Sequence, residues 1–366
     1  MINPNSTEID DVLNLQKALD LQVKKLNKIR EQVRDLAFTP IETVGFYSTV
    51  AYKAIDGGKM HISFEPLRID LIEVADSYGN LKMRFVVPKE SDEDEAEDKS
   101  FLESDPLIAN FIRLLGKEKL SEITELLNNS DTLMELSEWA CIFDKIIKSK
   151  EEPVILMRDG LLRTKKIKAE LIQVLWKVLK ENKKMVKLVG VSKTSRVIDL
   201  LSAALAMEHK FPERAIGFIK IPRQLELLAY RWSGSGKINT QTDKLNFAFG
   251  DIYIAKLSRT SNLLVTLEIP YNLKTDEEIY SPREVIEIIA HLSKDSMYSY
   301  PVIGYPQTIM RAHEAAARIG FPSSVIRDKV LDQLKEKMDE DGKNFMRDAE
   351  MINEFVSKGV LGGGSE

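Results

Sequence analysis

Cysteine is almost absent from this chain of 366 residues, in which Cys141 stands alone. A single thiol cannot form an internal disulfide, and such low cysteine usage is typical of proteins in a reducing cytoplasm, where we expect the chain to work. Because the chain has only four histidines beside this cysteine, it also lacks the ligands for a zinc-finger type of site.

Long apolar runs and an excess of positive charge are lacking too. No stretch of about 18 apolar residues occurs, so we expect no membrane span. The first residues contain no basic segment followed by an apolar core, and we expect no secretion signal. With a net charge of −5 and a pI near 5.7, the chain as a whole gives no indication of nucleic-acid binding, so a basic face would have to be local.

One short apolar run ends on an acid. Residues 154–157 read Val-Ile-Leu-Met, and Asp159-Gly160 follow after one arginine. Such a run is typical of a strand in the centre of a sheet that is covered on both faces. Asp-Gly is also a common turn dipeptide. The pattern therefore leaves two readings of Asp159, a turn residue or an acid placed for a metal or a substrate at the end of a strand.

The N-terminal part predicts one long helix over residues 7–37, closed by Pro40. Apolar residues with a single polar break follow a 3–4 spacing over about four heptads, at Val12, Leu15, Leu19, Gln22, Leu26, Ile29, Val33 and Leu36. The seam fits a coiled coil with a second subunit or partner, and equally a helix packed on its own domain. We expect residues 1–40 to form this N-terminal helix, 41–320 the main domain and 321–366 a charged, helical tail.

Three strand patterns follow, at residues 52–64, 67–74 and 81–87, and their short connections predict an antiparallel meander. Asp56, Gly57 and Gly58 lie within the first strand pattern. An acidic block at 90–98 favours a solvated, disordered loop of about residues 88–104.

Residues 105–148 are read as helices, and the last of them carries two glutamates. Its core face is predicted to consist of Leu136, Trp139, Ala140, Phe143, Ile146 and Ile147. Projection at about 100° per residue puts Glu135 at the edge of this face and Glu138 further out. Glu135 is therefore either an ordinary surface glutamate or a carboxylate that reaches a site between helix and sheet.

A strand–helix–strand–helix pattern surrounds and follows Asp159, with helices at 165–182 and after Thr194 or Ser195, and a strand at 185–191. This order implies parallel strands with right-handed crossovers. Between Lys145 and Arg196 the sequence has fifteen Lys or Arg against five Asp or Glu, which is the local positive field that a phosphodiester site needs.

The C-terminal half adds few motifs. Residues 213–245 look irregular, and Gly234-Ser-Gly-Lys237 is not a phosphate-binding Walker loop, because Ile238 stands where Ser or Thr is required. A hairpin is expected from strands at 245–257 and 263–269. His313 lies on a helix that follows Gly304-Tyr305-Pro306, and a lone helical histidine is usually structural.

Taken in order, four pieces resemble the NurA nucleases, the DNA-end nucleases that act beside the hexameric HerA translocase. The pieces are Ile55-Asp56-Gly57, a helix glutamate before Asp159-Gly160, Val189-Gly-Val-Ser-Lys193-Thr-Ser, and Gly304-Tyr305-Pro306 with Ala312-His313. The chain departs from the family in its acidic block at 90–98, in Gly58 where the family usually has Ser, and in the tail beyond 323.

The resemblance implies an α/β protein with an RNase H-like mixed sheet flanked by helices. It also implies a homodimer and manganese- or magnesium-dependent hydrolysis of DNA by an endonuclease or 5'-3' exonuclease. Partnership with a HerA-type ATPase would serve DNA-end repair or defence against phage. Carried over by position, Asp56, Glu135, Asp159 and His313 fall on the family's metal ligands, with Glu138 as the alternative helix glutamate. Lys193 and Tyr305 fall on the family's active-site lysine and tyrosine.

This residue set suits the chemistry. Two divalent ions about 4 Å apart can hold the attacking and leaving oxygens of a phosphodiester displacement, and manganese accepts both carboxylate and imidazole ligands. The alternative is a non-catalytic subunit of the same fold that clamps DNA or scaffolds a translocase ring.

Overall fold

The computed structural model describes residues 20, 23–24, 26–42, 49–64, 67–88, 100–127, 129–232 and 248–318, with 325, 329, 332, 336 and 342. The statements below concern these residues. The acidic block at 90–98 and nearly all of the predicted tail lie outside them. The predicted loop of 88–104 was too long at its end, because Ser100–Glu103 form the short helix α2.

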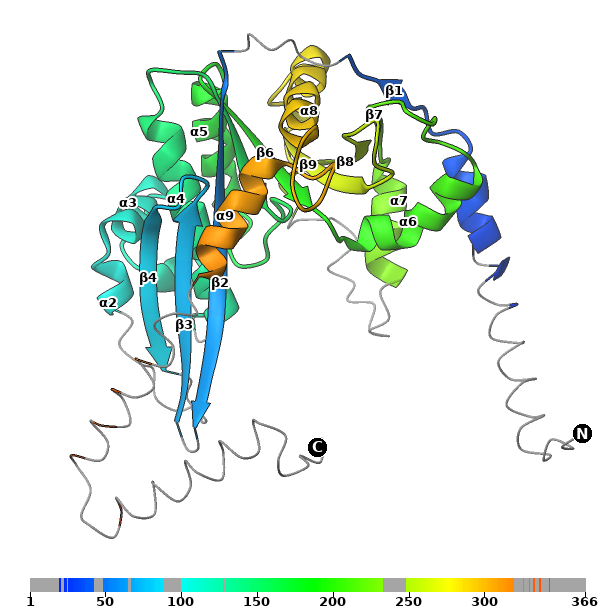
Figure 1. Cartoon of the computed structure of the whole chain (residues 1–366). Coiled ribbons are helices and arrows are strands. Elements are labelled where there is room, and N and C mark those ends of the chain that lie inside the picture. Colours follow the sequence, from blue (N-terminus) through cyan, green and yellow to red (C-terminus); the bar gives the residue numbers. More distant parts are fainter. Residues whose placement is uncertain are drawn as a thin grey trace, which may run out of the picture.

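A mixed sheet of ten strands organises the chain (Figure 1). Its order is β1-β7-β8-β9-β6-β5-β2-β3-β4, and β10 pairs with β9. The strands are β1 (Thr39–Pro40), β2 (Ala51–Phe64), β3 (Leu67–Asp76), β4 (Leu81–Pro88), β5 (Val154–Asp159), β6 (Val186–Ser192), β7 (Gly217–Lys220), β8 (Gly250–Lys256), β9 (Leu264–Asn272) and β10 (Glu277–Glu278).

The strand that ends on Asp159 lies in the middle of this sheet, as its apolar run predicts. β5 pairs in parallel with β2 on one side and with β6 on the other. Its residues Val154 to Met157 are buried. β2, β3 and β4 form the predicted antiparallel meander, and β8 pairs antiparallel with β9 as the predicted hairpin. The α/β class and the parallel strand–helix–strand unit are thus confirmed.

Helices cover both faces of the sheet. They are α3 (Pro106–Leu114), α4 (Ser130–Lys148), α5 (Ile172–Asn182), α6 (Arg196–Met207), α7 (Arg223–Trp232), α8 (Pro282–Ser296) and α9 (Gln307–Ala317), with a 3-10 turn, η1, at Leu120–Glu122. α4 packs on β2, β3 and β4, whereas α9 packs on β2, β3 and β5. Figure 1 shows α9 lying across β2 and β3, on the side away from α3 and α4. The part of β2 that carries Asp56 is therefore enclosed between two helices.

The described part of the N-terminal helix packs on its own chain. Residues 26–33 are helical, and the buried Ile29 and Val33 belong to one apolar cluster with residues of α6 and α7 such as Leu201 and Leu225. Arg30 Nε lies 2.9 Å from a carboxylate oxygen of Glu208, just after α6. Of the two readings of the heptad seam, the intrachain contact holds for these residues, while residues 7–19 lie outside the described part.

Two sequence expectations were wrong in the second half of the sheet. The stretch 213–245, expected to be irregular, contains β7 and α7, and residues 233–247 are not among those described. The helix expected from residue 165 begins at Ile172.

No helix among these residues is both long and apolar enough to cross a bilayer.

Candidate metal centre

Asp56 and Asp159 come from neighbouring parallel strands. Ile55 of β2 lies opposite Arg158 of β5, so the two aspartates each stand one position further along. Because side chains alternate between the faces of a sheet, both carboxylates point to the face that α9 covers. Gly160 takes a φ of 103°, a conformation that favours glycine, and turns the chain away. Asp159-Gly160 is therefore a strand end with a turn, and also the carrier of an acid aimed at a shared space.

α9 brings the histidine to these acids. His313 Nδ1 lies 2.8 Å from Asp56 Oδ2 and 3.5 Å from Asp159 Oδ2. One ligand atom from each of the three residues lies within 4.8 Å of the others. Asp56 is only 6% exposed, whereas 54% of the His313 side chain is exposed. We call Asp56, Asp159 and His313 the acid centre; it is open to solvent from the side of the imidazole.

Tyr305 and Lys193 stand beside the acid centre. The Tyr305 hydroxyl donates a hydrogen bond of 2.8 Å to Asp159 Oδ1, and the tyrosine side chain is buried. Lys193 lies in the loop after β6, with its Nζ 4.5 Å from the centroid of the Tyr305 ring. The structure thus brings together five of the six predicted site residues, counting Lys193 through this ring.

The electrostatics of the acid centre are unbalanced. Burial, reinforced by the neighbouring carboxylate of Asp159, raises the pKa of Asp56 to about 6, although the hydrogen bond with His313 acts in the opposite direction. Burial also raises the pKa of Tyr305 well above its usual range, and the Asp159 carboxylate adds to this effect. The tyrosine is therefore a neutral donor that fixes one oxygen of Asp159.

The helix glutamate that reaches toward these strands is Glu138, and the predicted outward position of Glu138 was wrong. Glu138 is 3% exposed, and its Oε2 accepts a hydrogen bond of 2.8 Å from Arg158 Nε. Glu135 lies at the border of the buried face, as predicted, with Oε1 3.8 Å from Arg158 Nη2. Neither glutamate belongs to the group of three ligand atoms.

Glu138 approaches the strand through a gap at Gly57. A Cβ atom at this position would lie 2.6 Å from Glu138 Oε1, so any larger residue would push the carboxylate away. Burial raises the pKa of Glu138 to about 7, and the nearby Asp56 carboxylate adds to this effect. The positive charge of Arg158 acts in the opposite direction. Gly57 therefore admits a third carboxylate, from α4, to the neighbourhood of Asp56.

Arg158 is a residue of this region that the sequence reasoning did not single out. Its guanidinium is buried, pairs with Glu138 at 2.7 Å and donates to the carbonyl of Leu161. The available signal was its place as the one charged residue between the apolar run of β5 and Asp159. Arg158 holds both Glu138 and the turn after Asp159 in place.

The donor set fits a hard divalent cation. Two carboxylates and one imidazole provide oxygen and nitrogen ligands of the kind that manganese accepts. The carboxylates lie close together with no lysine or arginine ion pair to either of them among the described residues. An excess of negative charge at this position favours a cation.

Part of this chain is similar in sequence to a known protein domain. Residues 51–231 match the sequence model of the NurA domain. No curated protein matches the chain by sequence.

Solved structures of NurA proteins align with nearly the whole chain. The NurA nuclease from Sulfolobus solfataricus is similar over 92% of this chain and 99% of its own, with a TM-score of 0.50 and 14% identity. A second NurA structure covers 90% and 98% with a TM-score of 0.46 and 9% identity. A structure of NurA with manganese covers 90% and 99% with a TM-score of 0.41 and 11% identity. By sequence, residues 51–231 form a NurA domain, and the fold that carries it is similar to that of the Sulfolobus NurA nuclease.

Proposed function

We propose that this protein is a metal-dependent DNA nuclease whose active site is the acid centre. The observation that carries the proposal is the convergence of Asp56, Asp159 and His313, with one ligand atom of each within 4.8 Å of the others. Phosphodiester hydrolysis needs charge stabilisation at a poor, anionic leaving group, and a cluster of ligands for hard cations provides the means. The family and the Sulfolobus NurA nuclease support the same reading.

The frame of this site is, in our proposal, an RNase H-like core. It comprises β4, β3, β2, β5 and β6, which are adjacent in this order. β2, β3 and β4 pair antiparallel, while β5 and β6 continue parallel to β2. Asp56 thus lies on β2, the central strand of the five, and Asp159 on its neighbour β5.

Two Mn²⁺ or Mg²⁺ ions per site complete the proposal. Asp56, Asp159 and His313 would hold them, and Glu138 replaces Glu135 as the helix carboxylate, because Gly57 opens the sheet to Glu138. Bound divalent ions supply Lewis-acid stabilisation of phosphate oxygens and of the attacking water. That a NurA structure with manganese exists supports this choice of metal.

The remaining side chains act on the substrate and on the ligands. Lys193, held over the Tyr305 ring, presents an ammonium group that faces a phosphate and stabilises the charge that develops on it. Tyr305 donates a hydrogen bond to Asp159 Oδ1 and so fixes the direction of the other oxygen toward the acid centre. Arg158 keeps Glu138 in its buried position.

We further propose a homodimer that acts on DNA beside a HerA-type hexameric ATPase, in end processing or phage defence. An exposed apolar surface supports a partner contact: Tyr298 and Tyr300 are each 81% exposed, and Ile303 lies beside them. Exposed apolar patches commonly mark protein–protein contacts. Replacement of Tyr300 and Ile303 by glutamate is expected to abolish co-purification with the ATPase without lowering DNA cutting by the isolated protein. Full retention of the ATPase would remove this surface as the contact.

The test of the nuclease is digestion of linear single- and double-stranded DNA with Mn²⁺ by the wild type, Asp56→Ala and Asp159→Ala. We expect cutting by the wild type and none by either variant. Equal residual cutting by all three proteins would indicate a contaminant and overturn the proposal. DNA binding without cutting by any of the three would favour the adaptor subunit instead.

A further inference from the structure

Besides Lys193, a second positively charged side chain lies on the same segment, that of Arg196 at the start of α6. Arg196 is exposed, and its Cζ lies 5.6 Å from the centroid of the Tyr230 ring. Within the described part of the chain, no carboxylate forms an ion pair with Arg196. Its surroundings differ from those of Arg84, Arg223 and Arg283, which each pair with a glutamate.

Lys193, three residues earlier, is held in the same way. Its Nζ lies over Tyr305, and the described residues give it no carboxylate partner either. An aromatic ring attracts a cation through its quadrupole and has no net charge of its own. Both side chains are therefore positioned while their full positive charge stays available to an anion.

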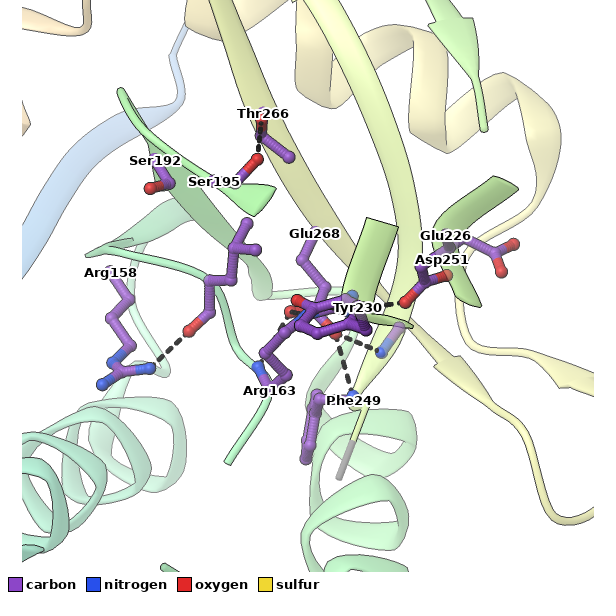
Figure 2. A network of polar contacts seen from close by, with 12 residues as sticks. Arg158, Arg163, Ser192, Ser195, Glu226, Tyr230, Phe249, Asp251, Thr266 and Glu268 are labelled. Atoms are coloured by element: carbon purple, nitrogen blue, oxygen red, sulfur yellow. Dashed lines mark hydrogen bonds and ion pairs between the residues drawn. The ribbon is translucent and has the colours of Figure 1, made fainter. Parts of the chain in front are cut away.

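The Tyr230 ring, against which Arg196 lies, is itself fixed by a hydrogen bond from Arg163. Arg163, four residues after Asp159, donates from Nη1 to the Tyr230 hydroxyl at 2.8 Å, and its Cζ lies 5.2 Å from the same ring. Arg163 is itself buried between Glu226 and Glu268. Figure 2 shows Tyr230 and Glu268 gathered around Arg163. Tyr230 is thus in contact with both a buried arginine and an exposed one.

The start of α6 is fixed independently. Ser195 caps the helix by accepting a hydrogen bond from the backbone N–H of Ile198 at 3.1 Å. The same hydroxyl lies 2.7 Å from Thr266 Oγ1 on β9, and Figure 2 shows this contact. The backbone that carries Lys193 and Arg196 is therefore tied to the sheet on the side of the acid centre.

We propose that Arg196 is a DNA-binding residue that contacts a backbone phosphate within a few positions of the one held by Lys193, and that Tyr230 positions it. This inference rests on the proposed nuclease function. Three peptide units span at most about 11 Å, and a DNA strand carries one phosphate per ~3.4 Å of helix axis. The two cations can therefore contact the same strand within a few phosphates, which sets the path of the strand from the acid centre past α6 toward α7.

The contact is to phosphate, so it is independent of base sequence and depends on salt. It also differs from the role of the acid centre. Arg196 contributes equally to the binding of substrate and of transition state, and its loss raises KM and leaves kcat unchanged.

The experiment measures binding of a fluorescein-labelled single-stranded oligodeoxynucleotide by anisotropy, in EDTA and over a series of KCl concentrations. Arg196→Ala is expected to weaken binding by about tenfold and to reduce the slope of log K against log salt by roughly 0.7. Arg196→Lys keeps the charge, so it retains the slope and loses less affinity. Tyr230→Leu, which frees the arginine, is expected to weaken binding less than Arg196→Ala.

Arg283→Ala is the matched control, because Arg283 is an exposed arginine on α8 that pairs with Glu287. Its affinity and slope are expected to equal those of the wild type. An unchanged affinity and slope in Arg196→Ala, or equal losses in Arg196→Ala and Arg283→Ala, would overturn the proposal.

Digestion assays of the same proteins separate this inference from the proposed function. A loss of binding in Arg196→Ala together with equal cutting by wild type and Asp159→Ala would remove the nuclease and leave Arg196 as a DNA-binding residue. Cutting that depends on Asp159, with unchanged KM in Arg196→Ala, would leave the nuclease and remove the role of Arg196.

Discussion

The acid centre and the network around Arg163 both gather carboxylates at the same sheet, and they treat these charges in opposite ways. In the Arg163 network, which consists of Arg163, Glu226, Glu268, Tyr230 and Arg223, each glutamate pairs with arginine. Glu226 lies 2.6 Å from Arg163 and 2.7 Å from Arg223. In the acid centre, Asp56 and Asp159 face each other with only a half-exposed imidazole between them.

The carboxylates of the two regions also differ in how deeply they are buried. Glu226 and Glu268 have no exposed surface, and Glu268 Oε1 also accepts the backbone N–H groups of Phe249 and Gly250, each at 2.9 Å. Removing one partner of a buried ion pair is strongly destabilising, because the other charge is left buried and uncompensated. The two neighbouring carboxylates of the acid centre have hydrogen-bond partners but no lysine or arginine ion pair among the described residues, which favours the binding of a cation. We therefore propose that the Arg163 network stabilises the fold and that the acid centre carries the metal-dependent chemistry.

Replacement of an acid in the acid centre should remove activity and leave the fold intact. We expect Asp159→Asn to lower the rate of DNA cutting on the order of 10³–10⁴-fold, because the ligand charge is lost while the amide still accepts the Tyr305 hydroxyl. The stability to urea is expected to stay equal or to rise, since one of two repelling charges is gone. Unfolding at markedly lower urea would mean that Asp159 is a structural residue.

Replacement of an acid in the Arg163 network should do the reverse. Glu268→Gln leaves the Arg163 guanidinium without one of its two carboxylates, and the expected loss of stability is about 3–5 kcal/mol. Denaturant unfolding followed by circular dichroism measures it. For the fraction that remains folded, cutting per molecule is expected to stay close to that of the wild type. A stable but inactive Glu268→Gln protein would place this glutamate in the chemistry.

Stabilisation of the protein by metal should depend on the acid centre. A ligand at about 100 times its Kd stabilises a protein by about 2.7 kcal/mol, so millimolar Mn²⁺ is expected to raise the Tm of the wild type and of Arg283→Ala. Asp56→Asn should show little or no rise. A thermal melt of the wild type that does not respond to manganese would count heavily against the acid centre as a metal site.

The smallest expected effect concerns Glu284, a partly exposed carboxylate that has a positively charged partner, Lys187, as the glutamates of the Arg163 network have arginines. Hydrogen bonds from Lys187 and from Ser281 lower the pKa of Glu284 to about 2, although burial alone would raise it. A depressed pKa in the folded state stabilises the fold above the unfolded value of about 4.5, and this contribution is lost as pH falls toward 2.

Glu284→Gln should therefore cost up to about 1 kcal/mol at pH 7, a figure reduced by partial exposure to solvent. Urea unfolding at a series of pH values should show that the difference from the wild type shrinks between about pH 4.5 and 2. A difference that stays constant over this range would show that the charge of Glu284 contributes nothing.

The features that could be predicted from sequence are those that depend on local pattern. The apolar run before Asp159 marks a central strand, and the short connections between β2, β3 and β4 mark a meander. Ser195, one of two expected caps, does cap α6. Asp56, Asp159 and His313 were joined by a family resemblance, because no local pattern shows that residues so far apart in sequence meet.

The errors have a common physical cause in long-range ion pairs. Glu138 was placed outward by projection from a single apolar face of the helix. In the structure α4 is buried on more than one face, and Arg158, twenty residues later, pairs with Glu138 in the interior. α7 was missed because its charged Glu226 interrupts the apolar pattern, while in the fold Arg163 and Arg223 neutralise it. A single sequence does not reveal such partners, since the cost of burying one charge is offset only by the other.

The most direct test of the account is a crystal of this protein soaked with Mn²⁺, with anomalous scattering used to locate the metal. The account predicts peaks bound by Asp56, Asp159 and His313, with Glu138 rather than Glu135 on the side of α4. Peaks held elsewhere, or none at this position in a preparation that cuts DNA with manganese, would contradict it.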